Sequence, residues 1–318
     1  WIQVILCSKS LSGEIDMNPV RRINRVFNSS QEIVIDDFSK IIIMSDCHRG
    51  DGGWGDNFSR NKNLYIAALR YYYDKGYTYI EIGDGDELWE NRNNTDIVEA
   101  YRDVFLILSK FYRDKRLYFL YGNHDMIKKD EEFVRNNLYE FYDERTNRII
   151  PLFPDIKIHE GLILVYKNKM NKILLTHGHQ VEILNSDLWR LGRFLVRYIW
   201  RPLELYGVNN PTSTAKNHKK KNKAAKKLTE WVKKEKHMLI AGHNHMPAFA
   251  EVGDIPYFND GSCVHYFSIT GIEIIEGKIM LVRWYTNTRN DGTLYVDREI
   301  IAGPRNLIDY FNRSEMGL

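Results

Sequence analysis

The stretch KIIIMSDCH, residues 40–48, decides the fold prediction, because a short β-branched apolar run is followed at once by polar residues. Such a run predicts a buried strand that ends in a loop. Helical patterns over 60–75, 96–114 and 130–141 separate the strands, so we expect a layered α/β domain. The same arrangement recurs in four further stretches: YTYIEIGD at 77–84, RLYFLYGNHD at 116–125, KILLTHGH at 172–179 and HMLIAGHNH at 237–245.

The rest of the pattern predicts how the domain is organised. Residues 269–285 alternate around a Glu-Gly-Lys turn and predict a hairpin, so the sheets are expected to be mixed. Between two of the strand-end motifs the pattern becomes helical, which predicts an inserted cap. We therefore expect an N-terminal extension over 1–39, a core over 40–180 and 237–318, and a helical cap insertion over 181–236.

Composition restricts the class of protein. The chain has 318 residues, of which 43% are hydrophobic and 27% charged, as is usual for a globular protein. No stretch reaches the roughly 20 apolar residues that a membrane helix needs. Residues 1–16 make a poor signal peptide, and Met17 is an alternative start. Cys7, Cys47 and Cys263 show no CxxC spacing, which argues against a disulfide framework and favours the cytoplasm.

Polar clusters follow the five predicted strands, and six of the ten histidines lie in them. Carboxyl ends of strands are where open α/β sheets place their ligands, so the clusters are expected to converge. Each cluster alone is a weak signal, but carboxylate oxygen with imidazole nitrogen suits manganese, iron, zinc or magnesium. The ordered set predicts a catalytic metal centre formed by 46–48, 83–87, 122–125, 177–179 and 242–245.

This ordered set resembles the calcineurin-like metallophosphoesterase superfamily, whose pattern is D-x-H, G-D-x-x-D, G-N-H-[ED], H and G-H-x-H. The resemblance spans about residues 40–285 and implies a four-layer α/β/β/α sandwich with two metals at the edge of its sheets. The NDGS at 259–262 is similar to a turn that often follows the last motif. Carried over, the resemblance assigns the first metal to Asp46, His48 and His245, the second to Asn123, His177 and His243, and the bridging position to Asp84.

The resemblance also implies a mechanism. Two divalent cations about 3.5–4 Å apart, with manganese preferred over iron, zinc or magnesium, would activate a bridging hydroxide that attacks a phosphomono- or phosphodiester. His124 resembles the family histidine that acts as general acid. Glu87 stands where the family usually has aspartate, and we expect it to orient His124, with Asp86 as its rival. His179 is expected either beside the metals or substrate, or on a solvated loop.

Within the superfamily, residues 177–204 resemble the branch of the UDP-diacylglucosamine pyrophosphatases. Those enzymes typically have arginine where this chain has His124, which favours a more general phosphatase or phosphodiesterase. A pyrophosphatase acting on a nucleotide-sugar lipid is the alternative. A metal-binding scaffold without activity is a more remote one, since all seven ligands are present.

Two basic segments bear on the substrate. Arg190, Arg193, Arg197 and Arg201 recur at helical spacing, and we expect Arg193 and Arg197 to bind substrate phosphate, unless the stripe is a solvated helix face. Residues 216–236 contain ten lysines against two glutamates. This run predicts a solvated helix or a surface for nucleic acid or anionic membrane, and a nuclease therefore remains a third reading.

Overall fold

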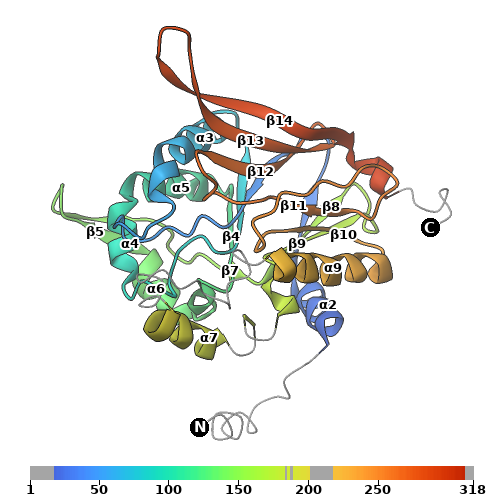
Figure 1. Cartoon of the computed structure of the whole chain (residues 1–318), viewed down its shortest axis with the longest axis horizontal. Helices are drawn as coiled ribbons and strands as arrows, with labels where there is room; N and C mark the ends of the chain where they lie inside the picture. Colours follow the sequence, from blue (N-terminus) through green and yellow to red (C-terminus); the bar gives the residue numbers. More distant parts are fainter. Residues whose placement is uncertain (1–17, 183–184, 187–188, 201–217, 312–318) are drawn as a thin grey trace, which may run out of the picture.

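The computed structural model describes residues 18–182, 185–186, 189–200 and 218–311, and it is built around two large β-sheets (Figure 1). The seven-stranded sheet is mixed: β2, β3, β4 and β7 are parallel, whereas β12, β13 and β14 are antiparallel. Its strands run in the order β14 (Leu294–Asn306), β13 (Lys278–Thr288), β12 (Ser268–Ile275), β2 (Lys40–Met44), β3 (Thr78–Ile82), β4 (Leu117–Leu120) and β7 (Ile158–His159).

The five-stranded sheet contains one antiparallel pair, β8 with β9, and otherwise parallel neighbours. Its order is β1 (Gln31–Ile35), β8 (Gly161–Tyr166), β9 (Lys172–Thr176), β10 (Met238–Ala241) and β11 (Tyr257–Asn259). A separate hairpin joins β5 (Glu140–Asp143) to β6 (Arg148–Pro151). Both sheets thus contribute strands whose carboxyl ends carry the polar clusters.

Side chains alternate between the two faces of each strand, so three hydrophobic cores lie between the four layers formed by the two sheets and the helices outside them. In β2, Ile42 and Met44 belong to the core shared with the helices on one side, whereas Ile41 and Ile43 face the second sheet. The outer helices on the seven-stranded sheet are α3 (Lys62–Asp74), α4 (Asn94–Ala100), α5 (Arg102–Arg113) and α6 (Glu131–Leu138). Those on the five-stranded sheet are α2 (Pro19–Ser29) and α9 (His218–Glu235). The expected α/β/β/α fold is therefore confirmed.

Some element boundaries differ from the sequence prediction. The helix expected over 96–114 is divided at Tyr101, whose φ of −114° and ψ of 28° lie outside the helical range. The helix expected over 130–141 ends at Leu138. Residues 140–143 form a strand instead, because Phe141 and Asp143 alternate into the interior while the strand pairs with β6. The hairpin expected over 269–285 is present as β12 and β13.

The N-terminal boundary at residue 39 also needs correction. β1 pairs in parallel with β8, and Ile23 and Val26 of α2 are buried against Ile163 and Leu174 of the same sheet. Residues 19–35 are therefore part of the sandwich rather than an extension of it. Residues 1–17, including the alternative start at Met17, lie outside the described residues.

The segment expected as a cap divides into two structurally different parts. Ala224, Leu228, Trp231 and Val232 of α9 are buried in the core cluster of the five-stranded sheet, so α9 is an outer layer of the sandwich. The other described part is α7 (Trp189–Leu195) with the π-helix η4 (Val196–Trp200). In the view of Figure 1, α7 is drawn below α6 and away from α9. Arg201 and residues up to 217 lie outside the described ranges.

Candidate metal centre

Backbone hydrogen bonds join the strand-end loops to one another. Asp46 N donates to Gly83 O at 3.1 Å, and His48 N donates to Asp84 O at 2.9 Å. Within the five-stranded sheet, Gly242 N donates to His177 O at 3.0 Å, and between the two sheets His243 N donates to the Asp46 carboxylate at 2.8 Å. The polar clusters that the sequence places up to two hundred residues apart are thus held in one place by their own backbone.

The backbone around the candidate ligands is strained. Non-glycine residues rarely adopt a positive φ, and each such residue costs on the order of 1–3 kcal/mol. Such strain is typical of sites where the surrounding structure forces a side chain to point in one direction. Five of the seven candidate ligands have it: Asp46 (50°), His48 (48°), Asp84 (51°), His243 (69°) and His245 (55°).

Gly83 shows how closely the loops approach. Its φ is 102°, and a Cβ added there would lie 2.8 Å from both the His177 ring and the backbone nitrogen of Gly122. Any side chain at this position would push β9 and the loop after β4 away from β3. Glycine is therefore required here by space as well as by conformation.

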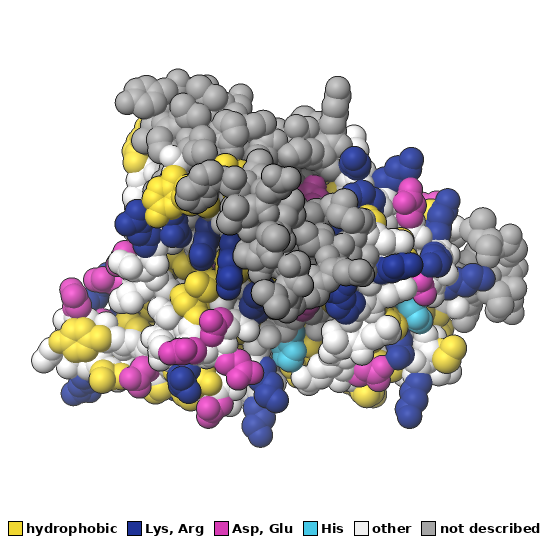
Figure 2. Space-filling view, turned by 90° about the horizontal axis from the view of Figure 1, so that it is seen from below, with side chains coloured by type: hydrophobic (Ala, Val, Ile, Leu, Met, Phe, Trp, Pro, Cys, Tyr) yellow, Lys and Arg dark blue, Asp and Glu magenta, His cyan; other side chains and the backbone are white. Residues whose placement is uncertain are grey.

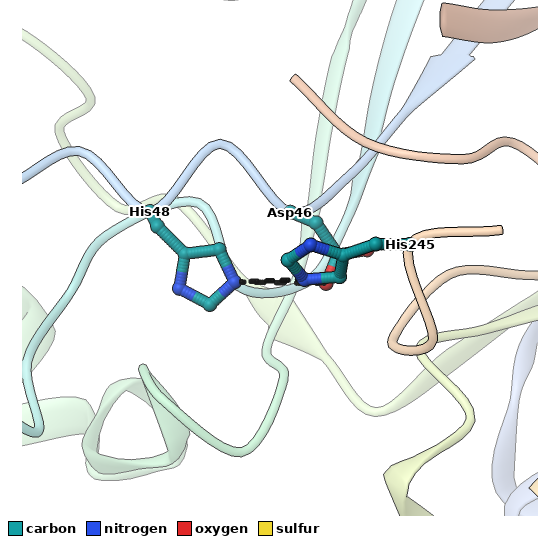
Figure 3. Close-up of side chains that lie close together, drawn as sticks. All are labelled: Asp46, His48 and His245. Carbon is teal, nitrogen blue, oxygen red and sulfur yellow. Dashed lines mark hydrogen bonds and ion pairs between the residues drawn. The ribbon is translucent and has the colours of Figure 1, made fainter. Parts of the chain in front are cut away.

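The first group of ligands comes from the loops after β2 and β10. Figure 3 shows His48 and His245 pointing toward one another beside Asp46. The Nε2 atoms of the two histidines are 3.2 Å apart, and His245 Nε2 lies 3.0 Å from Asp46 Oδ1. Three ligand atoms, two imidazole nitrogens and one carboxylate oxygen, converge here and suit a divalent cation.

The second group is more deeply buried and consists of Asp84, His177 and His243. His177 Nδ1 donates to Ile82 O at 3.0 Å, which leaves Nε2 as the lone-pair atom facing inward. Among the described residues, His177 Nε2 and Asn123 Oδ1 are buried without a hydrogen-bond partner. Buried polar atoms normally have one, so these two fit ligands of a metal ion.

Asp84 lies between the two groups. Its Oδ2 is 3.1 Å from His177 Nε2 and 3.8 Å from His48 Nε2. Burial would raise the pKa of the Asp84 carboxyl, but the positive charges of His177 and His124 outweigh it and hold that pKa well below its usual range. Burial by itself would lower the pKa of His177, but the carboxylates of Asp84 and Asp46 raise it to about 9. The site therefore attracts positive charge, whether proton or metal ion.

Glu87 lies between two histidines. One of its carboxylate oxygens is 2.8 Å from His48 Nδ1, and the carboxylate is also 2.8 Å from His124 Nδ1. The His124 side chain is 24% exposed, so a substrate can reach it. Asp86 is engaged elsewhere, by Arg49 at 2.7 Å and Lys128 at 2.7 Å. The structure thus places Glu87, and not its rival, beside His124.

Asp125 is a residue whose role the sequence motif did not reveal. Its carboxylate accepts hydrogen bonds from Gly122 N at 2.7 Å, Gly85 N at 3.1 Å and Lys128 Nζ at 2.8 Å. It therefore joins the loop after β4 to the loop that carries Asp84. The fourth letter of G-N-H-D was the available signal, but its partners are backbone groups that a sequence cannot show.

A network of buried, ion-paired side chains stabilises these loops. Both terminal nitrogens of Arg49 donate to Glu81, at 2.7 and 2.8 Å, and its Nε donates to Asp86. Lys128 connects Asp86 to Asp125. The positive charges of Arg49 and Lys128 lower the pKa of Asp86 to about 2 against the opposing effect of burial. We define these residues, Arg49, Glu81, Asp86, Asp125 and Lys128, as the buried network.

The turn at 259–262 supports Asp46. Ser45 Oγ donates to Asp260 Oδ1 at 2.8 Å, and Ser262 Oγ donates to Asp46 O at 3.1 Å. Burial and the nearby Asp46 carboxylate raise the pKa of Asp260 well above its usual range. The resemblance had identified this turn, and the structure adds that it contacts the first candidate ligand through backbone and hydroxyl groups.

His179 lies inside the protein, so its reading as a solvated loop residue is wrong. Its exposed fraction is 1%, and its ring centroid lies 5.5 Å from that of His177 and 6.5 Å from that of His243. Burial, with the charges of His177 and His243, lowers the pKa of His179 well below its usual value. Glu182, which the sequence analysis did not single out, lies 3.2 Å from His243 Nε2.

The cap arginines have different surroundings. Arg193 is partly buried with its guanidinium 4.8 Å from the Trp189 ring centre, and Arg190 is exposed. Arg197 instead donates to backbone carbonyls of residues 88, 89 and 91. The structure thus brings Arg197 to the loop beside the candidate metal centre, while Arg201 is outside the described residues.

The lysine-rich helix presents its charge outward. Figure 2 shows many Lys and Arg side chains on the face seen from below, interspersed with Asp and Glu. The exposed lysines described on and just after α9 are Lys223, Lys226, Lys233, Lys234 and Lys236. Lys227 turns inward and donates to Val181 O at 2.9 Å. None of the described helices is long and apolar enough to cross a membrane.

Comparison with known proteins and families gives the following similarities. Solved structures similar to it include Vps29 of Chaetomium thermophilum, at 11% identity and a TM-score of 0.36 over 82% of this chain and 96% of that one. A putative 5'-nucleotidase of Staphylococcus aureus, in complex with alpha-ketoglutarate, shows 13% identity and a TM-score of 0.33 over 82% and 53% of the two chains. No curated protein matches at a significant level. The family model described as calcineurin-like phosphoesterase matches residues 39–247, and the chain therefore belongs to that family.

Proposed function

We propose that the protein is a dinuclear metal-dependent phosphoesterase that hydrolyses phosphomono- or phosphodiesters. The observation that carries the proposal is the position of Asp84 between two groups of candidate ligands, each able to hold a cation. Asp46, His48 and His245 would hold one ion, Asn123, His177 and His243 the other, and Asp84 both. Manganese is our preferred metal, with iron, zinc and magnesium as alternatives. When bound, two such cations would polarise the phosphoryl oxygens and activate the attacking water.

His124 is proposed as the general acid. Its Nδ1 faces Glu87 at 2.8 Å, so its Nε2 is the nitrogen left to donate a proton to the leaving oxygen. Burial would lower the pKa of His124, but the carboxylates of Glu87 and Asp84 raise it above its usual value. This shift favours the protonated form that a general acid requires.

One feature supports a phosphorylated substrate with a second anionic group. Arg193 lies on the cap segment, where no carboxylate of the described residues forms an ion pair with it, and its pKa is lowered by burial and by the neighbouring Arg197 and Arg190. An anion beside it would relieve this repulsion. His179, buried behind His177 and His243, is proposed to fix the second ligand group or contact the substrate. We retain the cap, over the described 189–200, as the part that selects substrates.

Other substrate classes follow from particular features of the chain. The resemblance of 177–204 keeps a nucleotide-sugar-lipid pyrophosphatase as an alternative, although His124 argues for broader chemistry. The exposed lysines of α9 support contact with nucleic acid or with an anionic membrane. Contact with nucleic acid would be consistent with a nuclease activity. A cytoplasmic location remains part of the proposal, supported by the free thiols of Cys47 and Cys263.

The test is hydrolysis of a substrate panel by the metal-free protein reloaded with each metal in turn. Aryl phosphate monoesters, aryl diesters, cyclic nucleotides and nucleotide-diphosphate sugars separate the substrate classes, and elemental analysis gives the number of ions bound. We expect two ions per chain and turnover that depends on them. Two bound ions without hydrolysis of any member would instead support the non-catalytic scaffold.

A further inference from the structure

The loop that follows Glu87 is held by a residue of the cap segment. Arg197 Nε donates to Trp89 O at 2.9 Å, and Arg197 Nη2 donates to Leu88 O at 2.9 Å and Asn91 O at 3.1 Å. These bonds span more than one hundred residues of sequence. One guanidinium thus satisfies three backbone carbonyls of a single turn, which fixes the turn relative to η4.

Residues 87–90 contact His124 in two places. The Trp89 ring stacks on the His124 ring, with centroids 4.6 Å apart and planes inclined by 23°. Glu87, immediately before the loop, lies 2.8 Å from His124 Nδ1, and Glu90 N donates back to Glu87 Oε1 at 3.3 Å. Trp89 is only 4% exposed. Residues 87–90 therefore fix the orientation of the His124 imidazole, because Trp89 covers one face of the ring and Glu87 lies beside its Nδ1.

We propose that Arg197 and Trp89 are positioning residues for His124, through which the cap segment controls the alignment of the proton donor. The proposal rests on the proposed function, because it assumes that His124 donates the proton. Arg197 acts through the carbonyls of the loop, and Trp89 acts through its ring. Neither residue needs to contact the substrate.

The contacts distinguish this role from phosphate binding. Arg197 uses Nε and Nη2 on protein carbonyls, so the side-by-side pair of N–H groups that would grip a phosphate is already engaged. Arg193, four residues earlier, has its guanidinium over Trp189 instead. The two arginines that the sequence predicts to bind substrate together therefore have different roles. Arg197 affects the chemical step, and Arg193 affects substrate binding.

The chemical step explains why alignment matters. As the bond from phosphorus to the leaving oxygen breaks, a proton passes from His124 Nε2 to that oxygen, and the attacking water supplies the new oxygen on phosphorus. Solvent then returns the proton to His124. A rotated or displaced imidazole cannot transfer this proton efficiently, and a shift of about 1 Å can cost roughly 10²-fold in rate. The loss is largest for leaving groups that need protonation most.

The experiment compares Arg197→Ala, Trp89→Ala and Trp89→Phe with wild type on an alkyl phosphate and on p-nitrophenyl phosphate. We expect Arg197→Ala and Trp89→Ala to lower kcat on the alkyl ester by about 10- to 10²-fold, with a smaller loss on p-nitrophenyl phosphate and KM within about twofold. Trp89→Phe keeps an aromatic face and should restore most of the rate. Metal content should stay unchanged in every variant.

A matched control lies at the same junction. Arg92 belongs to the next turn of the loop and has its guanidinium 5.8 Å from the Tyr198 ring centre on η4. Among the described residues, it forms no hydrogen bond or ring contact with Trp89 or His124. Arg92→Ala therefore removes an arginine between loop and cap without removing the proposed coupling, and its kcat should match wild type.

His124→Ala separates this proposal from the proposed function. In that background, adding Arg197→Ala should cause no further loss of kcat, because both changes act through one proton donor. A phosphate-binding role would show instead as a raised KM with unchanged kcat, and a purely structural role as equal losses on both esters; either overturns the proposal. If Arg197→Ala fails to fold, Arg197→Lys and Trp89→Ala give the same comparison.

The remaining outcomes identify which proposal fails. A leaving-group-dependent loss in His124→Ala but not in Arg197→Ala or Trp89→Ala overturns the positioning role and leaves the proposed function standing. Equal losses for both esters in His124→Ala overturn the general acid and the positioning role together. Metal-independent hydrolysis by wild type would contradict the proposed function itself.

Discussion

The strand-end loops and the cap segment 189–200 hold their charged side chains in opposite ways. In the loops, the charged groups are buried and bonded to one another or to backbone, as Asp84, Asp125 and Lys128 are. On the cap, Arg190 is exposed and Arg193 only partly buried, with an aromatic ring as the neighbour that the structure records for each. In our proposals the loops therefore fix the chemistry and the cap selects the substrate, with Arg197 as the link between them.

Removing Asp84 should have the largest effect, because its carboxylate lies between both groups of ligands. We expect Asp84→Ala to abolish turnover and lower the number of bound metal ions, as measured by steady-state kinetics and elemental analysis. Asp114→Ala, which removes an exposed carboxylate beside Arg116, is the control and should change neither. Two bound ions and a near-normal rate in Asp84→Ala would contradict its bridging role.

Removing His124 should come next. His124→Ala is expected to keep both metal ions yet slow hydrolysis by about 10²–10⁴-fold, the usual contribution of general acid catalysis. The loss should be smaller for p-nitrophenyl esters than for alkyl esters, because the better leaving group needs less protonation. Loss of metal from this variant would place His124 among the ligands instead.

The buried network should be sensitive to the loss of one charge. Asp86→Asn leaves Arg49 and Lys128 buried with less compensation, and we expect it to lower the free energy of unfolding by about 3–5 kcal/mol at pH 7. Glu32→Gln, which breaks the more exposed pair with Lys172, should cost less than about 1 kcal/mol. Urea unfolding of both variants measures the contrast, and equal costs would remove the distinction between buried and exposed charge.

The same network predicts an acid dependence. The pKa of Asp86 is about 2 in the folded protein against an ordinary value of 3.8, so its stabilising charge is fully present above pH 4. As the pH falls from about 4 to 2, the carboxyl takes up a proton more readily in the unfolded chain, and this stabilisation is lost. Wild type and Asp86→Asn should therefore converge in stability across that range, and parallel curves would contradict the cause assigned to the shift.

Changes on the cap should be smaller and should depend on the substrate. Arg193→Ala is expected to raise KM by about 10-fold for a substrate with a second anionic group, as the loss of one charge-assisted hydrogen bond implies. A small aryl phosphate should be affected less, and kcat should stay near wild type. An unchanged KM on both substrates would make Arg193 an ordinary helix-face residue.

The lysines of α9 should have the smallest effect. Replacing Lys223, Lys226 and Lys233 by glutamate should leave hydrolysis of small esters unchanged, because these side chains are exposed on the outer layer of the sandwich. Any effect should appear only with nucleic acid or anionic vesicles, as weaker and less salt-dependent binding. Binding measured at two salt concentrations tests this, and identical binding by both proteins would assign the lysines to solubility alone.

The sequence alone determined the layered fold and the position of the candidate ligands. Both depend on local signals. Apolar strands such as 40–44 can be recognised from their composition, and a side chain directly after a strand must lie at the edge of the sheet. The sequence therefore predicts that Asp46, Asp84 and His177 lie near one another. Their identities as metal ligands remain predictions that Asp84→Ala and metal analysis will test.

Only the tertiary structure decided the contacts that depend on distant segments. Neighbouring carboxylates such as Asp86 and Glu87 look equivalent in sequence, yet Asp86 faces Arg49 and Glu87 faces His124. The bonds of Arg197 to the loop after Glu87 are likewise invisible in helical spacing, which shows which residues share a face but not what that face meets. Long-range packing supplies that information, because it sets which backbone carbonyls and rings lie within reach.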